Sequence, residues 1–237
     1  MSLASDPSTR PLAPVAFGEL MESLADDEMV NIVLNHNGDV LRIQRTLLLN
    51  LSPWFDKALT SGFIEGQSLT LRFHDVPADV VQMFVYWIFH RRLPWDEDGP
   101  DAEMLETCRQ HQALLARLWM FGEEHLLSEL QHAAIRALSD QLLYAFPAVE
   151  LLLEVYGGTA PGSSLRTVMA NEVAWGWRGE QRPWSNHSPF YSRADLDRVG
   201  AISGFTADFA IALERQTVQA HLSDDERDAC LWRLREA

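Results

Sequence analysis

Long apolar runs, cysteine and lysine are all scarce in this chain of 237 residues. The longest apolar stretch, residues 80–89, is interrupted by Gln82 and is shorter than the ~18 residues of a membrane span, so no membrane partner is expected. The first residues lack the charged start and apolar core of a signal peptide. Cys108 and Cys230 lie far apart in sequence, outside any metal-ligand spacing. These features predict a cytoplasmic or nuclear protein.

Positive charge is also scarce. The chain has 19 Lys and Arg residues against 34 Asp and Glu residues, a formal net charge of −15. Proteins that bind nucleic acids need Lys and Arg to neutralise phosphates, so no nucleic-acid partner is expected. Lys57 is the only lysine. We attribute this to genome composition, with a limit on lysine-directed modification as the alternative.

The most strongly patterned part of the sequence is residues 40–93. Its first residues alternate between apolar and polar, which predicts a half-buried strand, and leucines at helical spacing follow. Ser52 and Pro53 predict the end of that helix and the start of another, because proline suits a first helical turn but cannot continue an earlier one. Alternation returns at residues 69–73, after two glycines that are expected to loosen the backbone. Pro77 is then predicted to open the longest apolar helix.

The residues before this stretch predict three simpler features. Residues 1–15 have little periodicity and predict a flexible tail. Apolar residues at helical spacing predict a short amphipathic helix over residues 17–24. A strand is predicted at residues 29–34, and Asn37-Gly38 is a hairpin signal that would join it to the next strand. The short helix would pack on its own domain or, alternatively, be swapped in a dimer.

The patterned stretch resembles the BTB/POZ domain. That family's central pattern is a hydrophobic residue with His-Lys, a leucine, Ser-Pro-aromatic-Phe, and then Gly-Phe-x-Glu. The corresponding residues here are Ile43-Gln44-Arg45, Leu48, Ser52-Pro53-Trp54-Phe55 and Gly62-Phe63-Ile64-Glu65. The resemblance covers about residues 17–178. It implies an α+β protein with the BTB/POZ fold, a small mixed β-sheet flanked by a cluster of helices, followed by an α-helical C-terminal extension.

The second half of the chain is predicted to be helical. Residues 115–138 resemble the paired C-terminal helices of fungal BTB proteins, with Gly122 where two helices approach closely. Ser164 is predicted to cap a later helix, and Ser223 and Glu226 form the capping box of the last one. The predicted organisation is a flexible tail at 1–15, a BTB/POZ-like domain at 16–143, and a helical C-terminal extension at 144–237 with a loop around 179–195.

Motifs for catalysis are missing from the sequence. There is no Gly-x-Ser-x-Gly elbow and no His-Glu-x-x-His helix, and the glycine-rich segment 157–164 lacks the Gly-Lys-Ser/Thr end of a phosphate loop. Cys108 and His111, with His125 and His132 on a neighbouring helix, have ligand spacing, but a zinc site needs four converging donors. We therefore expect no enzyme, cofactor or metal. A zinc-dependent enzyme remains the alternative from another class.

Two adjacent carboxylates also raise the question of acid–base chemistry. Glu123 and Glu124 are interpreted as lying at a helix start, where the helix dipole stabilises negative charge. Solvated capping then explains them better than catalysis does.

A BTB/POZ-type domain would act by binding proteins, first of all a second copy of itself. The resemblance implies a two-fold dimer built from the helices after the hairpin. The interface candidates are Leu47, Leu51, Trp54 and Phe55, some of which must also fill the core of the monomer. Our leading hypothesis is a non-enzymatic, homodimeric protein–protein interaction module.

The alternative hypothesis is a substrate adaptor for a cullin-based ubiquitin ligase. Adaptor members carry a hydrophobic-x-Glu motif after the second helix, and Phe63-Ile64-Glu65 fits it. An exposed phenylalanine beside a carboxylate would suit a cullin groove. Phe63 would instead be a buried packing residue if the motif were structural. No MATH, Kelch or zinc-finger domain that could gather a substrate is recognisable.

A third hypothesis is transcriptional co-regulation through a co-repressor. Regulators of this family use a charged pocket built from an acidic and a basic residue. Here Gln44-Arg45 replaces His-Lys, and Met29 stands where the family has Asp. The resemblance therefore implies that the acidic partner is missing.

The extension offers one further candidate surface. Three tryptophans cluster near its predicted loop: Trp175, Trp177 and Trp184. Exposed, they would form a binding site for an unknown protein partner; the alternative is burial beneath the extension.

Overall fold

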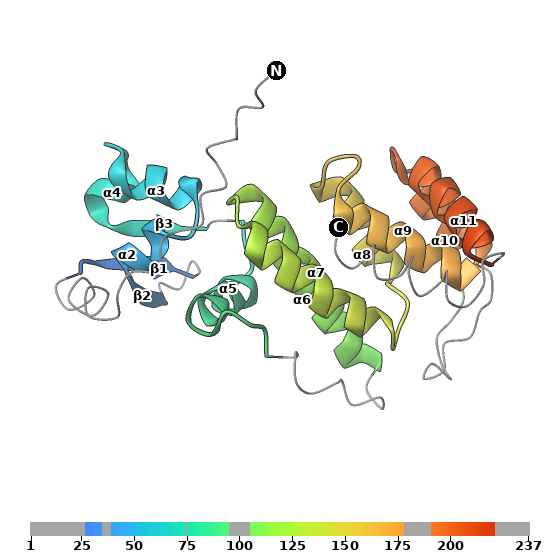
Figure 1. The fold of residues 1–237 in the computed structure, drawn as a ribbon, viewed down its shortest axis with the longest axis horizontal. Helices are drawn as coiled ribbons and strands as arrows, with labels where there is room; N and C mark the ends of the chain where they lie inside the picture. The colour runs from blue at the N-terminus through green and yellow to red at the C-terminus, as the bar shows by residue number, and fades with distance from the viewer. Residues whose placement is uncertain (1–26, 35–38, 74, 95–104, 178–190, 221–237) are drawn as a thin grey trace, which may run out of the picture. The chain divides into compact units, whose positions relative to one another are not determined.

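The computed structural model describes residues 27–34, 39–73, 75–94, 105–177 and 191–220 (Figure 1). The chain divides into two compact units, Met1–Arg72 and Phe73–Ala237. The predicted boundary near residue 143 stays a prediction. Several predicted features lie outside the described residues: the tail at 1–15, the helix at 17–24, the Asn37-Gly38 turn, Trp184, and the Ser223 capping box.

The first unit contains a three-stranded mixed sheet in the order β2-β1-β3. β1 pairs antiparallel with β2 and parallel with β3. The register places Val30 opposite Ile43 and Ile32 opposite Leu71, and all four side chains are buried. One face of the sheet therefore belongs to the core. The elements are β1 (Met29–Val33), β2 (Val40–Gln44), α2 (Arg45–Leu49), α3 (Pro53–Thr60), α4 (Ile64–Ser68) and β3 (Thr70–Arg72).

The helical start at Ser52-Pro53 is confirmed. Pro53 is the first residue of α3, and the backbone N–H of Phe55 donates to Ser52 Oγ over 3.4 Å. This bond satisfies one of the backbone donors that a helix start leaves without a partner in the helix.

Helix α4 was not predicted, because its formation depends on a close backbone contact and leaves no periodic pattern in the sequence. A Cβ added to Gly66 would lie 2.7 Å from the carbonyl oxygen of Ser61 and 3.0 Å from that of Leu59. Glycine at this position lets α4 pack against the end of α3. Leu69 then takes a left-handed conformation, with φ 46°, and leads the chain into β3.

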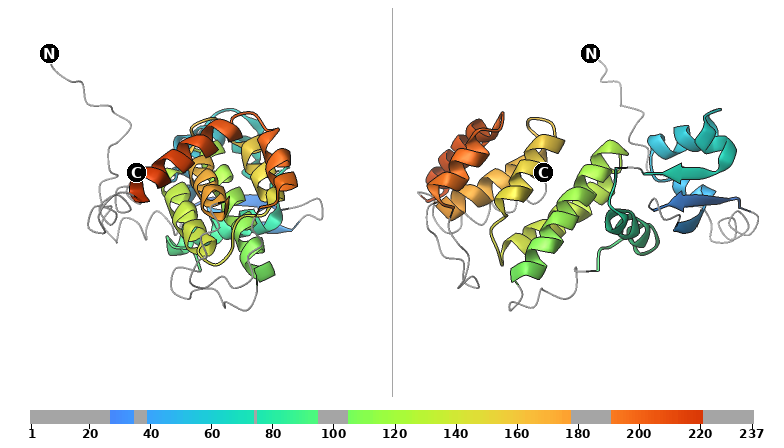
Figure 2. Two further views of the ribbon diagram at one scale, coloured as in Figure 1. Left: turned by 90° about the vertical axis from the view of Figure 1, so that its right-hand side faces the viewer. Right: turned by 180° about the vertical axis from the view of Figure 1, so that it is seen from behind.

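The second unit is helical throughout its described residues (Figure 2). The predicted apolar helix after Pro77 and the predicted paired helices are confirmed. None of the described helices combines the length and the apolar character needed to cross a bilayer. The elements are α5 (Ala78–His90), α6 (Leu105–Glu124), α7 (Ser128–Leu142), α8 (Val149–Gly158), α9 (Ser164–Trp177), α10 (Arg193–Gly200) and α11 (Phe205–Ala220).

Helices α6 and α7 form a hairpin whose elements lie side by side in Figures 1 and 2. A Cβ added to Gly122 would lie 2.9 Å from Cγ of Gln131, so the prediction of a close approach at Gly122 is confirmed. At the other end of the hairpin, the fully buried Gln112 donates from Nε2 to the carbonyl oxygen of Ala145 over 2.8 Å. That bond satisfies a carbonyl just beyond the end of α7.

Two helix starts in the extension differ from the prediction. α9 begins at Ser164 itself, and its cap is Ser163, whose Oγ accepts from the backbone N–H of Arg166 over 3.3 Å. α10 begins at Arg193 with a Ser192–Asp195 capping box, so residues 193–195 are helical and not part of the predicted loop. Both α10 and its capping box were missed in a segment rich in proline and serine.

The α+β class is confirmed: a small mixed sheet accompanies ten helices in the described residues, an arrangement consistent with a BTB-like fold.

Candidate protein-binding site

The first unit presents two adjacent apolar side chains at the start of α4. Phe63 is the N-cap of this helix and is 57% exposed, and Ile64, its first residue, is 74% exposed. Glu65 lies half-buried in the first helical turn. The interpretation of Phe63 as a buried packing residue was therefore wrong.

Backbone and side-chain hydrogen bonds hold this segment in place. The backbone N–H of Gln67 donates to the carbonyl oxygen of Phe63 over 3.1 Å, and Gln67 Nε2 donates to the carbonyl oxygen of Gly62 over 2.9 Å. Together with the close packing at Gly66, these bonds fix the backbone that carries the two apolar side chains. An apolar pair on an ordered backbone loses less conformational entropy on binding than a flexible one would.

The structure divides the predicted dimer residues into two groups. Phe55 is fully buried and belongs to the core, so it presents no surface to a second copy. Leu47, Leu51 and Trp54 are half-buried. The Trp54 ring contacts Phe55 edge-on, with ring centroids 4.9 Å apart. These three residues on and between α2 and α3 are the part of the predicted interface that solvent can reach.

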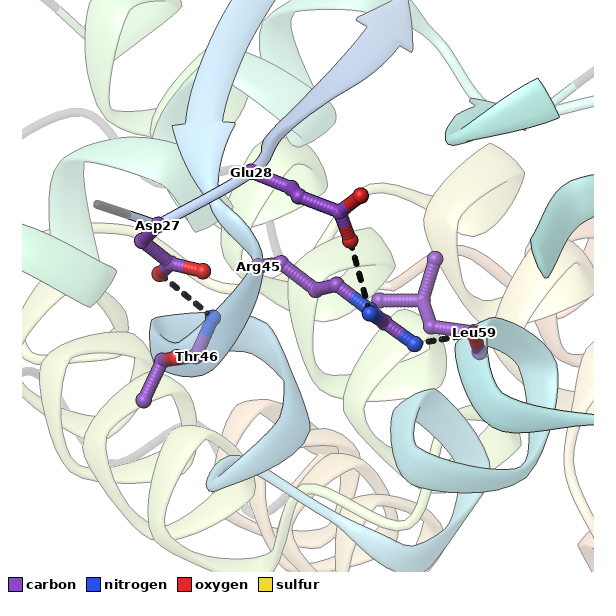
Figure 3. A network of polar contacts seen from close by, with 5 residues as sticks. All are labelled: Asp27, Glu28, Arg45, Thr46 and Leu59. Carbon is purple, nitrogen blue, oxygen red and sulfur yellow. Dashed lines mark hydrogen bonds and ion pairs between the residues drawn. The ribbon is translucent and has the colours of Figure 1, made fainter. Parts of the chain in front are cut away.

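A polar network surrounds the start of α2 (Figure 3). Arg45 Nη1 donates to Glu28 Oε2 over 2.7 Å, and Nη2 donates to the carbonyl oxygen of Leu59 over 3.0 Å. The backbone N–H of Thr46 donates to Asp27 Oδ2 over 2.8 Å. The network ties the strand entry and the end of α3 to the first turn of α2.

This network corrects one inference from the sequence. The resemblance implied that Arg45 lacked an acidic partner because Met29 replaces the family's Asp. Glu28, one residue earlier, supplies that partner. Met29 itself is 41% exposed and pairs with Gln44 across the sheet.

The tryptophans of the extension are only partly available to a partner. Trp175 is half-buried, and Trp177, at the end of α9, is 51% exposed. Between them, Gly176 is buried: a Cβ added there would lie 3.0 Å from the Tyr191 ring. Of the two extension tryptophans that the structure describes, Trp177 is the more exposed.

The residues considered for zinc do not converge. Within the described ranges, no three or more His, Cys, Asp or Glu side chains are placed to hold a metal ion. Cys108 is buried, and its burial raises the pKa of the thiol, which disfavours the reactive thiolate. His125 is buried as well, and its burial lowers the pKa of the imidazole. Its Nδ1 lies 2.8 Å from the carbonyl oxygen of Phe121, on whose ring it stacks.

A pocket in the second unit was not anticipated from the sequence. It has a volume of about 600 Å³ and lies between the segment before α5, the last turns of α6, and α8. Glu123 and Glu124 line it. They end α6 rather than begin a helix, so the interpretation of these two residues as capping carboxylates was wrong.

No protein-family model matches the chain. A segment of 67 residues, 28% of this chain, is 32% identical to Kelch-like protein 8 of Caenorhabditis elegans. The match covers 10% of the length of that protein. The similarity therefore concerns a short part of each of the two proteins.

Proposed function

We propose that this chain is a non-enzymatic protein–protein interaction module that forms a homodimer and recruits further proteins. The observation that carries the proposal is the surface of Leu47, Leu51 and Trp54 on α2 and α3, which stays partly exposed in the single chain. Burying such apolar surface is the main favourable term in protein association. The fold class and the short similarity to a Kelch-like protein support the same BTB-type reading.

The homodimer is tested by size-exclusion chromatography with light scattering at tens of micromolar protein. We expect a dimer for the wild type and a monomer for Leu47→Glu, because a carboxylate in the centre of the interface would lose its hydration. Thr60→Glu is the matched control: it adds the same charge at an exposed position of α3 and should stay dimeric. A monomeric wild type at this concentration would contradict the proposal.

The second candidate function is a substrate adaptor of a cullin-based ubiquitin ligase. It is favoured by the exposure of Phe63 and Ile64, with Glu65 beside them, on a backbone held by hydrogen bonds. A phenylalanine that inserts into a partner's groove is a typical binding hot spot, and its truncation costs about 2 kcal/mol or more. Kelch is one of the substrate-gathering domains of such adaptors, so the similarity to a Kelch-like protein also favours this function.

A pull-down with purified cullin tests the adaptor function. We expect Phe63→Ala to weaken binding by about tenfold or more without lowering the melting temperature. Phe89→Ala is the matched control, because Phe89 is 54% exposed on α5 and should be neutral for cullin binding. A wild type that does not bind cullin, or a Phe63→Ala protein that is only less stable, would rule the adaptor function out.

The other hypotheses stay predictions. A co-repressor pocket would have to use Arg45 although its guanidinium already donates to Glu28 and Leu59. Metal analysis of the purified protein tests the zinc enzyme. Affinity purification tests the extension. If a protein that lacks the residues after 143 loses partners that the full-length protein binds, the extension, with Trp177, has a binding role.

A further inference from the structure

The pocket in the second unit has an apolar base and a polar rim. Val80 at the start of α5 and Phe121 on α6 line it and are buried, at 0% and 3% exposure. Met120 and Pro77 add further apolar surface. Its volume of about 600 Å³ is in the range of about 300–1,000 Å³ typical of sites that take a side chain or a small ligand.

The rim is strongly acidic. Four carboxylates line the pocket, those of Asp75, Glu123, Glu124 and Glu154, and Arg117 is the only Lys or Arg among the lining residues that the structure describes. Four negative charges less one positive charge leave these residues at −3.

Arg117 does not compensate the other three carboxylates, because Glu154 already engages it. Arg117 Nε donates to Glu154 Oε1 over 2.6 Å, and Nη2 donates to Oε2 over 2.9 Å. The hydrogen bond that Arg117 donates to Glu154 raises the pKa of Arg117, and the charges of Glu154 and Asp79 add to this. Among the residues that the structure describes, none forms an ion pair with the carboxylates of Asp75, Glu123 or Glu124.

The position of Glu123 and Glu124 on their helix increases the negative potential. They are the last two residues of α6, a helix of 20 residues. The carbonyl ends of a helix carry partial negative charge, which stabilises cations and opposes carboxylates. No basic residue lies in the last turn of α6. A cation from outside would therefore meet two carboxylates and a helix C-terminus that have no ion-pair partner in the part of the chain that the structure describes.

We propose that this pocket binds an arginine side chain, flanked by apolar residues, from a segment of a partner protein. The guanidinium would pair with the carboxylates at the rim, where its planar fork allows two parallel hydrogen bonds. Its methylene stem and the apolar neighbours would cover Val80, Met120 and Phe121. Lysine fits less well, because its ammonium is a more strongly hydrated point charge. The Arg117–Glu154 pair shows the same recognition within the chain.

The experiment follows the methyl signal of Met120 by NMR in the full-length protein, with Met120→Leu to assign it. The probe is the peptide acetyl-Leu-Arg-Leu-amide. We expect it to shift the Met120 signal in a saturable way. Glu123→Gln combined with Glu124→Gln should weaken binding at least fivefold. Raising NaCl from about 50 mM to about 300 mM should weaken binding further, because exposed charges are screened.

Two controls distinguish binding in the pocket from a general attraction of the peptide to the negatively charged protein. Glu129→Gln combined with Glu214→Gln removes two exposed carboxylates on α7 and α11 and should leave binding unchanged. Acetyl-Leu-Gln-Leu-amide, which lacks the cation, should not bind.

Four results would overturn the proposal: no shift of Met120 at about 10 mM peptide, equal binding of the glutamine peptide, equal weakening by the control variant, or spermidine binding as tightly as the arginine peptide. The last would indicate a general cation site. The pocket lies in the second unit, and none of its residues belongs to the proposed dimer surface. A negative result with the arginine peptide would therefore leave the homodimer proposal untouched. A monomeric protein would likewise leave the pocket proposal untouched.

Discussion

Arg45 in the first unit and Arg166 in the second each join different secondary-structure elements, but they do so in different surroundings. The Arg45 side chain is 29% exposed, and that of its partner Glu28 is 57% exposed. Arg45 Nε is buried and finds no partner among the described residues. Water competes for such an ion pair, so it contributes little to the free energy of folding.

Arg166 is 5% exposed. Its Nη2 donates to the carbonyl oxygen of Tyr156 over 2.8 Å, and its Nε donates to Thr159 Oγ1 over 3.0 Å. It also bonds the carbonyl oxygen of Thr159 and lies 4.8 Å from the centre of the Tyr156 ring. Tyr156 in turn donates to Asp208 Oδ2 over 3.1 Å. Arg166 therefore joins α9 to α8 and its end, and Tyr156 joins α8 to α11.

We expect burial, more than the number of hydrogen bonds, to decide how much each arginine contributes to the free energy of folding. Where water can replace the lost hydrogen bonds, removing the arginine lowers the free energy of unfolding only slightly. Where water cannot reach, the carbonyl groups stay without a donor, and each costs about 1–3 kcal/mol.

The largest effect is expected for Arg166→Met, which keeps the apolar stem and removes the donors. We expect the free energy of unfolding, measured by urea denaturation, to fall by about 3 kcal/mol. Arg198→Met is the matched control, because Arg198 is 52% exposed and makes an exposed pair with Glu150; it should cost less than about 1 kcal/mol. Equal losses of unfolding free energy for the two variants would show that burial does not determine the contribution of an arginine.

An intermediate effect is expected at alkaline pH through Tyr156. Its burial, followed by the charge of Asp208 and their hydrogen bond, raises the pKa of Tyr156 above the ordinary value of 10.0. Above that pH the unfolded tyrosine loses its proton while the folded one keeps it. The stability from this difference is fully present below about pH 10 and is lost as the pH rises further.

Tyr156→Phe checks this dependence. We expect the variant to be about 1.5 kcal/mol less stable near neutral pH, because Asp208 loses a hydrogen bond. Between about pH 9 and pH 11 it should lose less additional stability than the wild type. Parallel curves for the two proteins would show that Tyr156 ionises at its ordinary pKa.

The smallest effect is expected for Arg45→Met. The exposed pair with Glu28 is worth about 1 kcal/mol at most, and the bond to the carbonyl oxygen of Leu59 is only partly buried. The same urea denaturation should show a loss below that value, which should shrink further in high salt. A loss as large as that for Arg166→Met would mean that the first unit depends on this network for its fold.

Local patterns predicted much of the fold. Alternation located β2, the Ser52-Pro53 pair located the start of α3, and the resemblance of residues 115–138 to paired helices located the hairpin of α6 and α7. These succeed because caps and amphipathic faces act over one or two turns. The prediction for Glu123 and Glu124 failed because the Leu126-Leu127 corner, where Leu126 has a φ of 57°, carries no glycine or proline signal.

The contact sites depend on distances that no local pattern records. The spacing of Phe63, Ile64 and Glu65 predicted a protein-binding motif, but the exposure of the first two side chains follows from the tertiary structure, in which Gly66 packs on the end of α3. The acidic pocket brings together Asp75, Glu123 and Glu154, and Arg45 reaches back 17 residues to Glu28. Residue order along the chain specifies the helices, strands and caps, because those forces act between near neighbours. Which charges meet, and which apolar side chains stay in water, follows from how the elements pack.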